Sequence, residues 1–129
     1  MTIQQIHESI LAKAGNTKWA EQLTTAVKID ITNPTIVEEL ELRAEKYRVE
    51  ALWQSAYDYE REQISGSAIG LLAMGVMQGN PKCLAIQNWI KSIWTEYYTR
   101  KANGSTNYDF SVAGICPHTV PELMVELGL

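Results

Sequence analysis

The sequence of 129 residues has few of the side chains that usually carry catalysis or bind metals. It contains two histidines, His7 and His118, and two cysteines, Cys83 and Cys116. A structural zinc site needs four ligands at recognisable spacing, and the chain has neither a CxxC nor an HxxxH pattern. It also has no Gly-rich phosphate loop, no GxSxG and no Glu-x-x-His pair. We therefore expect no metal, no cofactor and no enzymatic activity.

Two local clusters are the remaining candidates for chemistry. Cys116 and His118 are separated by one proline, so a thiol and an imidazole lie close in sequence. Catalytic Cys–His pairs usually come from distant segments, and a turn before a final helix is the favoured interpretation. Asp58, Glu60 and Glu62 form an acidic group, which we interpret as a solvated helix face.

The sequence also has no basic block and no long apolar run. Its formal net charge is −4, which provides no electrostatic footprint for nucleic acid. The longest apolar stretch, residues 68–77, is much shorter than the ~20 residues that cross a bilayer. The N-terminus does not resemble a signal peptide. These features favour a cytoplasmic protein whose two cysteines are free thiols, with a disulfide between them as the alternative.

Length and composition favour one helical domain over residues 1–129. Hydrophobic residues make up 46% and charged residues 20% of the chain, as in folded globular proteins. Apolar residues at helical spacing predict short helices before Gly15 and over residues 17–27. Residues 28–32 alternate and predict an extended connector. The organisation is thus 1–32 short helices and connector, 33–104 central helices, and 105–129 C-terminal loop and short helix.

Two long helices form the centre of the predicted all-α fold. Asn33-Pro34 and Asn80-Pro81 are strong helix starts, because Asn caps well and Pro suits the first turn. They predict helices over residues 34–63 and 81–102, folded back on each other as an antiparallel pair. On the first helix the apolar stripe changes near Ala51, which indicates different partners for its two halves.

The stretch between the long helices is rich in small residues. Residues 68–78 are apolar nearly all round, which is typical of a buried helix. Gly66, Gly70, Gly75 and Gly79 occur at spacings of four or five. Because glycine destabilises a helix interior, we expect packing to offset its cost. The pattern predicts close helix packing at these glycines, in the centre of the fold or of an oligomer.

The C-terminal part is predicted as a loop followed by one short helix. Residues 105–116 have no helical period, and we expect Tyr108, Phe110, Val112 and Ile115 to pin this loop to the helices. Thr119 and Glu122 match a capping box. The final helix is predicted over residues 121–127, with apolar side chains at Leu123, Val125 and Leu127.

Aromatic residues are the most informative group. The chain has four Trp and six Tyr but only one Phe. Trp and Tyr have a polar tip, and they are enriched at protein interfaces. All of them could instead lie in the core. The candidates for an interface are Trp53, Tyr57, Trp89, Trp94 and Tyr98.

Four stretches together resemble small helical proteins encoded in the tail gene clusters of tailed bacteriophages and prophages. They are residues 47–53, 79–83, 89–101 and 117–123, within a similar region of roughly 34–125. The resemblance implies a role in tail structure or tail assembly, in the host cytoplasm or the virion, exerted through protein–protein contact.

Two hypotheses for function follow. The first is a non-enzymatic interaction or assembly protein of phage or prophage origin, whose partner is another protein or a second copy of this chain. The second is a small regulatory or ligand-binding helical domain with a pocket lined by Trp and Tyr.

Overall fold

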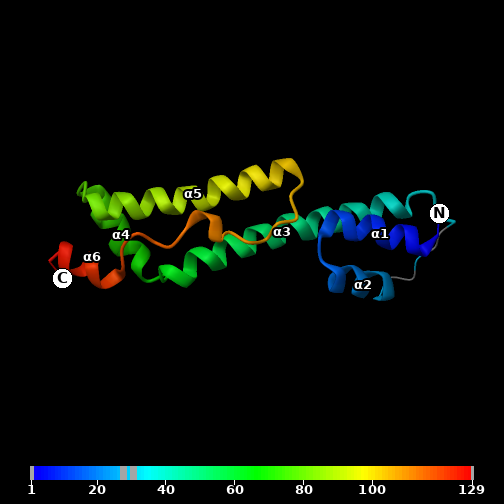
Figure 1. The fold of residues 1–129 in the computed structure, drawn as a ribbon, viewed down its shortest axis with the longest axis horizontal. Helices are drawn as coiled ribbons and strands as arrows, with labels where there is room; N and C mark the ends of the chain where they lie inside the picture. Colours follow the sequence, from blue (N-terminus) through cyan, green and yellow to red (C-terminus); the bar gives the residue numbers. More distant parts are fainter. Residues whose placement is uncertain (1, 27–28, 30–31, 129) are drawn as a thin grey trace. The chain divides into compact units, whose positions relative to one another are not determined.

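The computed structural model describes residues 2–26, 29 and 32–128, and no strand occurs among them (Figure 1). The prediction of an all-α protein is therefore confirmed. The connector expected over residues 28–32, together with Val27, lies largely outside the described residues. The helices are α1 (Ile3–Ala14), α2 (Thr17–Ala26), α3 (Ile36–Gln63), α4 (Ala68–Met77), α5 (Pro81–Asn103), the 3-10 helix η1 (Ser111–Ala113) and α6 (Val120–Glu126).

The chain divides into two compact units, each of which contains part of α3 and part of α5. Unit 1 comprises residues 1–52 and 100–107, and unit 2 comprises residues 53–99 and 108–129. The prediction of one domain over residues 1–129 stays a prediction.

Capping residues explain where several helices begin and end. Thr2 accepts a hydrogen bond from the backbone N–H of Gln5, and Gly15 ends α1 at φ 65°. Thr119 and Glu122 form the predicted capping box of α6. Asn80 accepts from the backbone N–H of Cys83 and so caps α5 at the predicted residue.

The start of α3 differs from the sequence prediction by two residues. Asn33 accepts hydrogen bonds from the backbone N–H and the hydroxyl of Thr35, so it stabilises a turn that includes Pro34. The α-helix then begins at Ile36.

The core of unit 1 is aliphatic and joins α1, α2 and the first half of α3. Its buried side chains are Ile6, Ile10, Ala14, Ala20, Ile36, Leu40 and Ala44, and Trp19 and Tyr47 are among the half-buried groups packed against them. The rings of Trp19 and Tyr47 stack with centroids 4.4 Å apart. Leu40, Ala44 and Tyr47 in the first half of α3 therefore pack on α1 and α2.

Buried residues on α3 recur at every fourth position along the whole helix. They are Ile36, Leu40, Ala44, Arg48, Leu52, Ala56 and Glu60, and the row continues to Ile64 beyond the helix end. An α-helix has 3.6 residues per turn, so each step of four rotates the buried face by about 40°. This rotation explains why no single apolar stripe could be followed past Ala51. It also carries two charged residues, Arg48 and Glu60, into buried positions.

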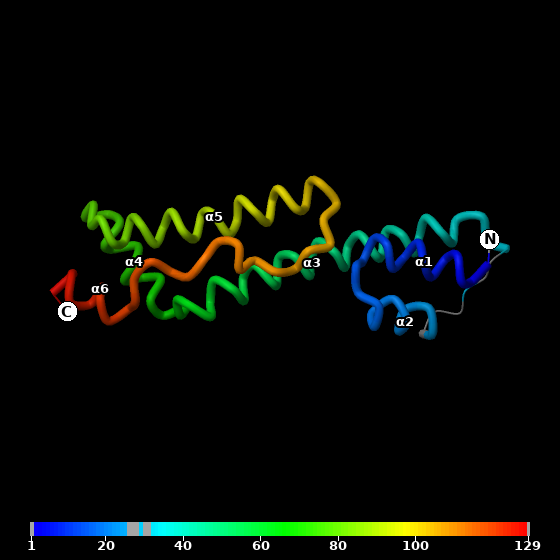
Figure 2. Tube along the Cα trace, in the orientation of Figure 1, coloured from blue at the N-terminus to red at the C-terminus, as the bar shows by residue number. Residues whose placement is uncertain are grey.

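The core of unit 2 combines α3, α4, α5 and the C-terminal segment. Its buried side chains include Ala56, Leu72, Cys83, Ile86, Ile93, Tyr97, Phe110 and Leu123. The segment between η1 and α6 contacts both long helices (Figure 2), because Gly114 O accepts from the hydroxyl of Tyr59 at 2.5 Å and from Nε1 of Trp89 at 3.0 Å.

The side chains that anchor this C-terminal segment differ in part from those expected. Phe110 is buried, whereas Val112 and Ile115 are 73% and 81% exposed. The prediction that these two pin the loop is wrong, because the hydrogen bonds to Gly114 anchor it instead. On α6, Leu123 is buried but Val125 is exposed.

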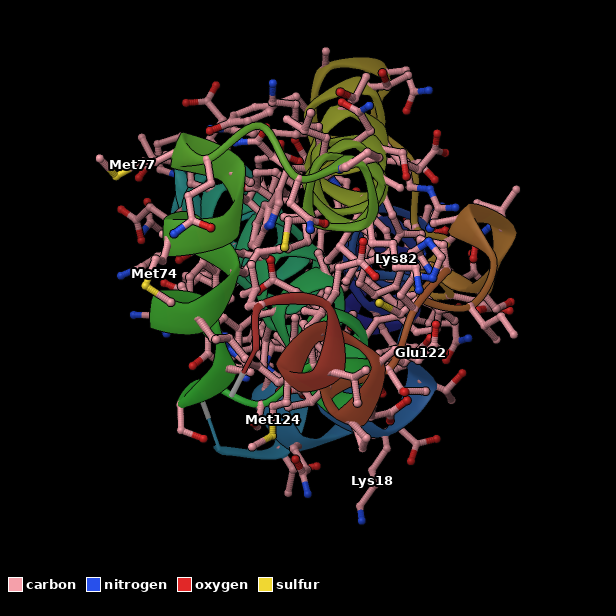
Figure 3. The ribbon with its side chains drawn as sticks, turned by 90° about the vertical axis from the view of Figure 1, so that its left-hand side faces the viewer. Lys18, Met74, Met77, Lys82, Glu122 and Met124 are labelled. Atoms are coloured by element: carbon pink, nitrogen blue, oxygen red, sulfur yellow. The ribbon has the colours of Figure 1, made fainter. Side chains whose placement is uncertain are left out.

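Helix α4 is covered on one side only within the single chain, which corrects the prediction that it lies in the centre of the fold; burial in an oligomer stays a prediction. Ala68, Leu72 and Gly75 are buried, but Met74 and Met77 are 40% and 89% exposed. Figure 3 shows both methionines pointing outward from α4. An apolar sequence with no periodicity did not reveal which face α3, α5 and α6 would leave open.

Candidate interaction surface and groove of unit 2

Five aromatic rings of unit 2 form a connected cluster, here called the aromatic cluster: Trp53, Tyr57, Trp94, Tyr97 and Tyr98. Trp53 stacks on Tyr57 with centroids 5.2 Å apart, and its ring lies 5.9 Å from that of Trp94. Trp94 meets Tyr97 edge to face at 5.6 Å, and Tyr97 meets Tyr98 at 5.0 Å. Trp53 is 44% exposed and Tyr98 is 63% exposed, so large apolar rings face solvent.

Helix geometry explains how these rings come together. Trp53 and Tyr57 are four residues apart on α3 and directly follow the buried positions Leu52 and Ala56. Residues with this spacing lie on the same helix face, beside the buried row. Tyr97 links Trp94 to Tyr98 from a buried position, since its side chain is only 5% exposed. It therefore supports the exposed rings from below and is not itself an exposed candidate.

Trp89 does not belong to this surface, which corrects its assignment as an interface candidate. Its side chain is 7% exposed, and Nε1 donates to Gly114 O. The ring also lies 6.2 Å from that of Tyr59. Trp89 therefore holds the C-terminal segment on α5. Sequence spacing could not distinguish it from Trp94, because the partner residue is 25 positions away.

A charged pair lies beside the aromatic cluster. Glu60 is only 6% exposed, and its Oε1 accepts from Nε1 of Trp94 at 3.3 Å. Its Oε2 lies 3.7 Å from Nε of Arg61, whose guanidinium sits 5.1 Å from the ring centre of Tyr57. The prediction that Asp58, Glu60 and Glu62 form a solvated face is wrong for Glu60, because it occupies the buried row of α3.

Next to this pair, unit 2 has an open groove of about 490 Å³. Its walls come from α3, α4 and α5: Glu60, Arg61, Ile69, Leu72, Ala73, Val76, Met77, Gln87 and Ile90. No Trp or Tyr lines it, in contrast to the aromatic pocket expected for a ligand-binding domain. Trp19 and Tyr47 line a smaller hollow of about 260 Å³ in unit 1, together with charged side chains.

The four glycines expected at close helix contacts have different surroundings. A Cβ placed on Gly75 would collide with Sγ of Cys83 and lie 3.0 Å from its Cβ. A Cβ on Gly66 would meet only Nη1 of Arg61, at 4.0 Å, and Gly70 and Gly79 have nothing within 4 Å. Close packing at Gly70 and Gly79 is therefore corrected: Gly70 lies on an exposed part of α4, and Gly79 follows the helix end at φ 74°.

The geometry around the two cysteines does not form a thiol–imidazole couple. Sγ of Cys116 donates to the backbone oxygen of His118, while Nδ1 of His118 pairs with Glu122 at 3.0 Å. Burial raises the pKa of the Cys116 thiol and that of the Cys83 thiol, which disfavours the nucleophilic thiolate in both. Both thiols are free.

Neither a metal-binding cluster nor a membrane span emerges from the part of the chain that the structure describes. There, no three residues among His, Cys, Asp and Glu are grouped so that they could hold a metal ion. Over the same residues, no helix has both the length and the apolar character needed to cross a bilayer.

No protein-family model matches the chain, and comparison with curated proteins and with solved structures finds no match.

Proposed function

We propose that the protein is a non-enzymatic interaction or assembly protein and that the aromatic cluster of unit 2 is its contact surface. The observation that carries this proposal is the exposure of Trp53 and Tyr98 within a connected set of rings. Trp and Tyr are the residues most enriched among those that dominate binding energy at interfaces, and they act best when clustered.

The neighbouring charges suit a protein partner. Gln54 donates to Asp58 at 2.8 Å on the exposed side of α3, and Arg61 stacks over Tyr57 at the other edge of the cluster. An apolar centre with polar groups at its rim is the usual composition of a protein interface. The partner proposed first is a second copy of this chain, so that the protein is a homo-oligomer.

Sedimentation velocity and light scattering over a range of protein concentrations test this proposal. The wild-type mass should rise above that of a monomer with increasing concentration, while a Trp53→Ala/Tyr98→Ala variant stays monomeric. Leu42→Ala is the matched control, because Leu42 is 70% exposed and lies outside the aromatic cluster. A wild-type protein that remains monomeric at every concentration would contradict self-association.

We propose further that α3 and α5 form an antiparallel pair. Support comes from three contacts in which the residue number rises along α3 while it falls along α5. Arg48 donates a hydrogen bond to Arg100 O, the ring of Trp53 lies near that of Trp94, and the ring of Tyr59 lies near that of Trp89. Spin labels at positions 58 and 91 should then be closer together than labels at 58 and 99. The opposite order of the two distances would refute the pairing.

We also propose a phage or prophage origin, with a role in tail structure or assembly, which places the protein in the host cytoplasm or the virion. Support comes from the resemblance carried by residues 47–53, 79–83, 89–101 and 117–123. Inspection of the gene neighbourhood tests it. Flanking tail genes are the expected result, and a locus without phage genes would remove this proposal while leaving the contact surface untouched.

A further inference from the structure

We propose that the exposed face of α4 is a contact with α4 of a second copy of this chain, and that the two helices lie antiparallel about a twofold axis. The face, here called the α4 row, consists of Gly66 in the turn before α4 and of Gly70, Ala73 and Met77, all of which are exposed. The proposal rests on the self-association proposed above. The aromatic cluster joins two chains, and the α4 row joins such pairs into larger assemblies.

The first argument is the spacing of the α4 row. Its members are separated by four, three and four residues, so they lie on one side of the helix. This spacing is the same when it is read in the opposite direction. In an antiparallel pair, Met77 therefore opposes Gly66 of the second copy, and Gly70 opposes its Ala73. A twofold contact needs such a self-complementary surface.

The second argument is the size of the side chains in the α4 row. Met77 is 89% exposed and points outward from α4 (Figure 3). A Cβ on Gly70 would have nothing within 4 Å in its own chain. Because glycine destabilises a helix interior relative to alanine, a glycine in open space has no benefit for the single chain. A second helix at close range uses this space, and Met77 then fills the space beside Gly66 of the second copy.

The third argument is the absence of charge. No residue between positions 64 and 81 is charged, although a helix face that is turned to solvent usually carries charged side chains. Each chain has a formal net charge of −4, so two copies repel each other. At the α4 row two copies can approach without placing like charges opposite one another, whereas a charged partner would find no group with which to pair.

The contact is short, which explains why it acts only on chains that are already paired. Helix α4 has 10 residues. At 1.5 Å per residue it is about 15 Å long, and a contact of this length is smaller than the roughly 1,200 Å² of a stable specific interface. Two chains joined by their aromatic clusters present two α4 rows. The second contact between two such pairs then forms at a high effective concentration.

Sedimentation velocity over a range of protein concentrations tests the proposal. Wild type should form assemblies larger than a dimer at high concentration. Ala73→Glu should stop at the dimer, with the association of dimers weakened at least about 10-fold, because it brings two carboxylates together in a contact without counter-charges. Ala12→Glu is the matched control. It adds the same charge at an exposed position of α1 and should assemble like the wild type.

A second variant separates specific packing from general stickiness. Gly70→Leu adds apolar surface but fills the space that Ala73 of the second copy occupies. Specific packing therefore predicts weaker assembly beyond the dimer, whereas unspecific hydrophobic contact predicts stronger assembly. Circular dichroism checks that each variant is folded.

A mixing experiment identifies the partner as a second copy. Ala73→Glu and Ala73→Lys should each stop at the dimer, and an equimolar mixture of the two should form the larger assemblies again. The reason is that opposite charges then meet across the twofold contact.

Four results would overturn the proposal: a wild type that stops at the dimer or below it, an Ala73→Glu variant that assembles like the wild type, a Gly70→Leu variant that assembles more strongly, or a mixture that regains nothing. The aromatic cluster has a different failure. A Trp53→Ala/Tyr98→Ala variant that assembles like the wild type would remove the aromatic cluster as a contact surface, so the two failures are distinguishable.

Discussion

Units 1 and 2 each bury one charged side chain from the row of buried residues on α3, and these two side chains differ in how completely they are hydrogen-bonded. Arg48 in unit 1 donates to the backbone oxygens of Arg100, Lys101 and Ser105 at 2.9–3.0 Å and pairs with Glu45. Glu60 in unit 2 has one hydrogen bond of 3.3 Å from Trp94 and a looser ion pair with Arg61.

The two units therefore differ in how completely they pair a buried charge. In unit 1 the guanidinium of Arg48 satisfies carbonyl groups at the C-terminal end of α5, which a helix end leaves without partners. In unit 2, Nε and Nη1 of Arg61 have no hydrogen-bond partner among the residues that the structure describes, and the rings of Trp53 and Tyr98 face solvent. A buried polar group that is fully hydrogen-bonded stabilises and rigidifies a fold, whereas one that is incompletely paired costs stability.

The largest expected effect is the loss of Arg48. Arg48→Met should lower the free energy of unfolding by about 3 kcal/mol or more, because several buried carbonyl groups lose their donor. Arg48→Lys should recover little of this loss, since one ammonium cannot reproduce the guanidinium fork. Urea denaturation measures both, with Arg43→Met as the control at an exposed position of α3. A loss below about 1 kcal/mol for Arg48→Met would contradict the role given to its hydrogen bonds in unit 1.

The next largest effect concerns α4, where two glycines differ in their surroundings. Gly75→Ala should destabilise by about 1–3 kcal/mol, because the new methyl group collides with Cys83. Gly70→Ala, in open space on the same helix, should instead stabilise by about 0.5–1 kcal/mol. Thermal unfolding compares the two. Adding Cys83→Ala should relieve part of the Gly75→Ala cost, and identical effects at both glycines would contradict the packing described.

A smaller effect is expected at Glu60. Glu60→Gln keeps an amide oxygen for the indole of Trp94 and removes only the loose pairing with Arg61, so the stability should change by less than about 1 kcal/mol. The same denaturation assay as for Arg48 measures it. A loss as large as that of Arg48→Met would show that Glu60 is held as firmly as Arg48 and would contradict its looser pairing.

The smallest effect is a pH dependence in unit 1. The hydrogen bond from Arg48 lowers the pKa of Glu45 below its usual value of 4.5. Because this pKa is lower in the folded protein than in the unfolded protein, the ionised Glu45 stabilises the fold at pH values above its unfolded-state pKa. This contribution to stability is lost as the pH falls through the folded-state pKa. Wild type should therefore lose more stability than Glu45→Gln between neutral pH and pH values below 4.5. Equal losses in stability curves of the two proteins would contradict this.

Local sequence signals predicted the helices well, because their causes are local. The cap at Asn80, the stop at Gly15 and the box formed by Thr119 and Glu122 each depend on residues within four positions. The exception was Asn33, whose side chain bonds to Thr35 and delays α3 to Ile36.

The candidate site could be predicted only in part. Trp53, Tyr57, Trp94 and Tyr98 were found as candidates, because Trp and Tyr are conspicuous in a sequence with one Phe. The sequence did not show that Trp89 differs from these four residues. The hydrogen-bond partner that buries it lies in the distant C-terminal segment. Arg61 and the groove gave no sequence signal, since a single charged residue at a helix end is ordinary.

The sequence by itself determined that the chain is helical and where most helices begin and end, because propensity and capping act over a few residues. Only the tertiary structure decided which faces are buried. The row of buried residues on α3 rotates around the helix axis by about 40° for every four residues, so different neighbours bury it along the helix. That rotation placed Arg48 among the carbonyl groups of α5 and Glu60 beside Trp94, and α4 kept one apolar face open because the surrounding helices cover only the other.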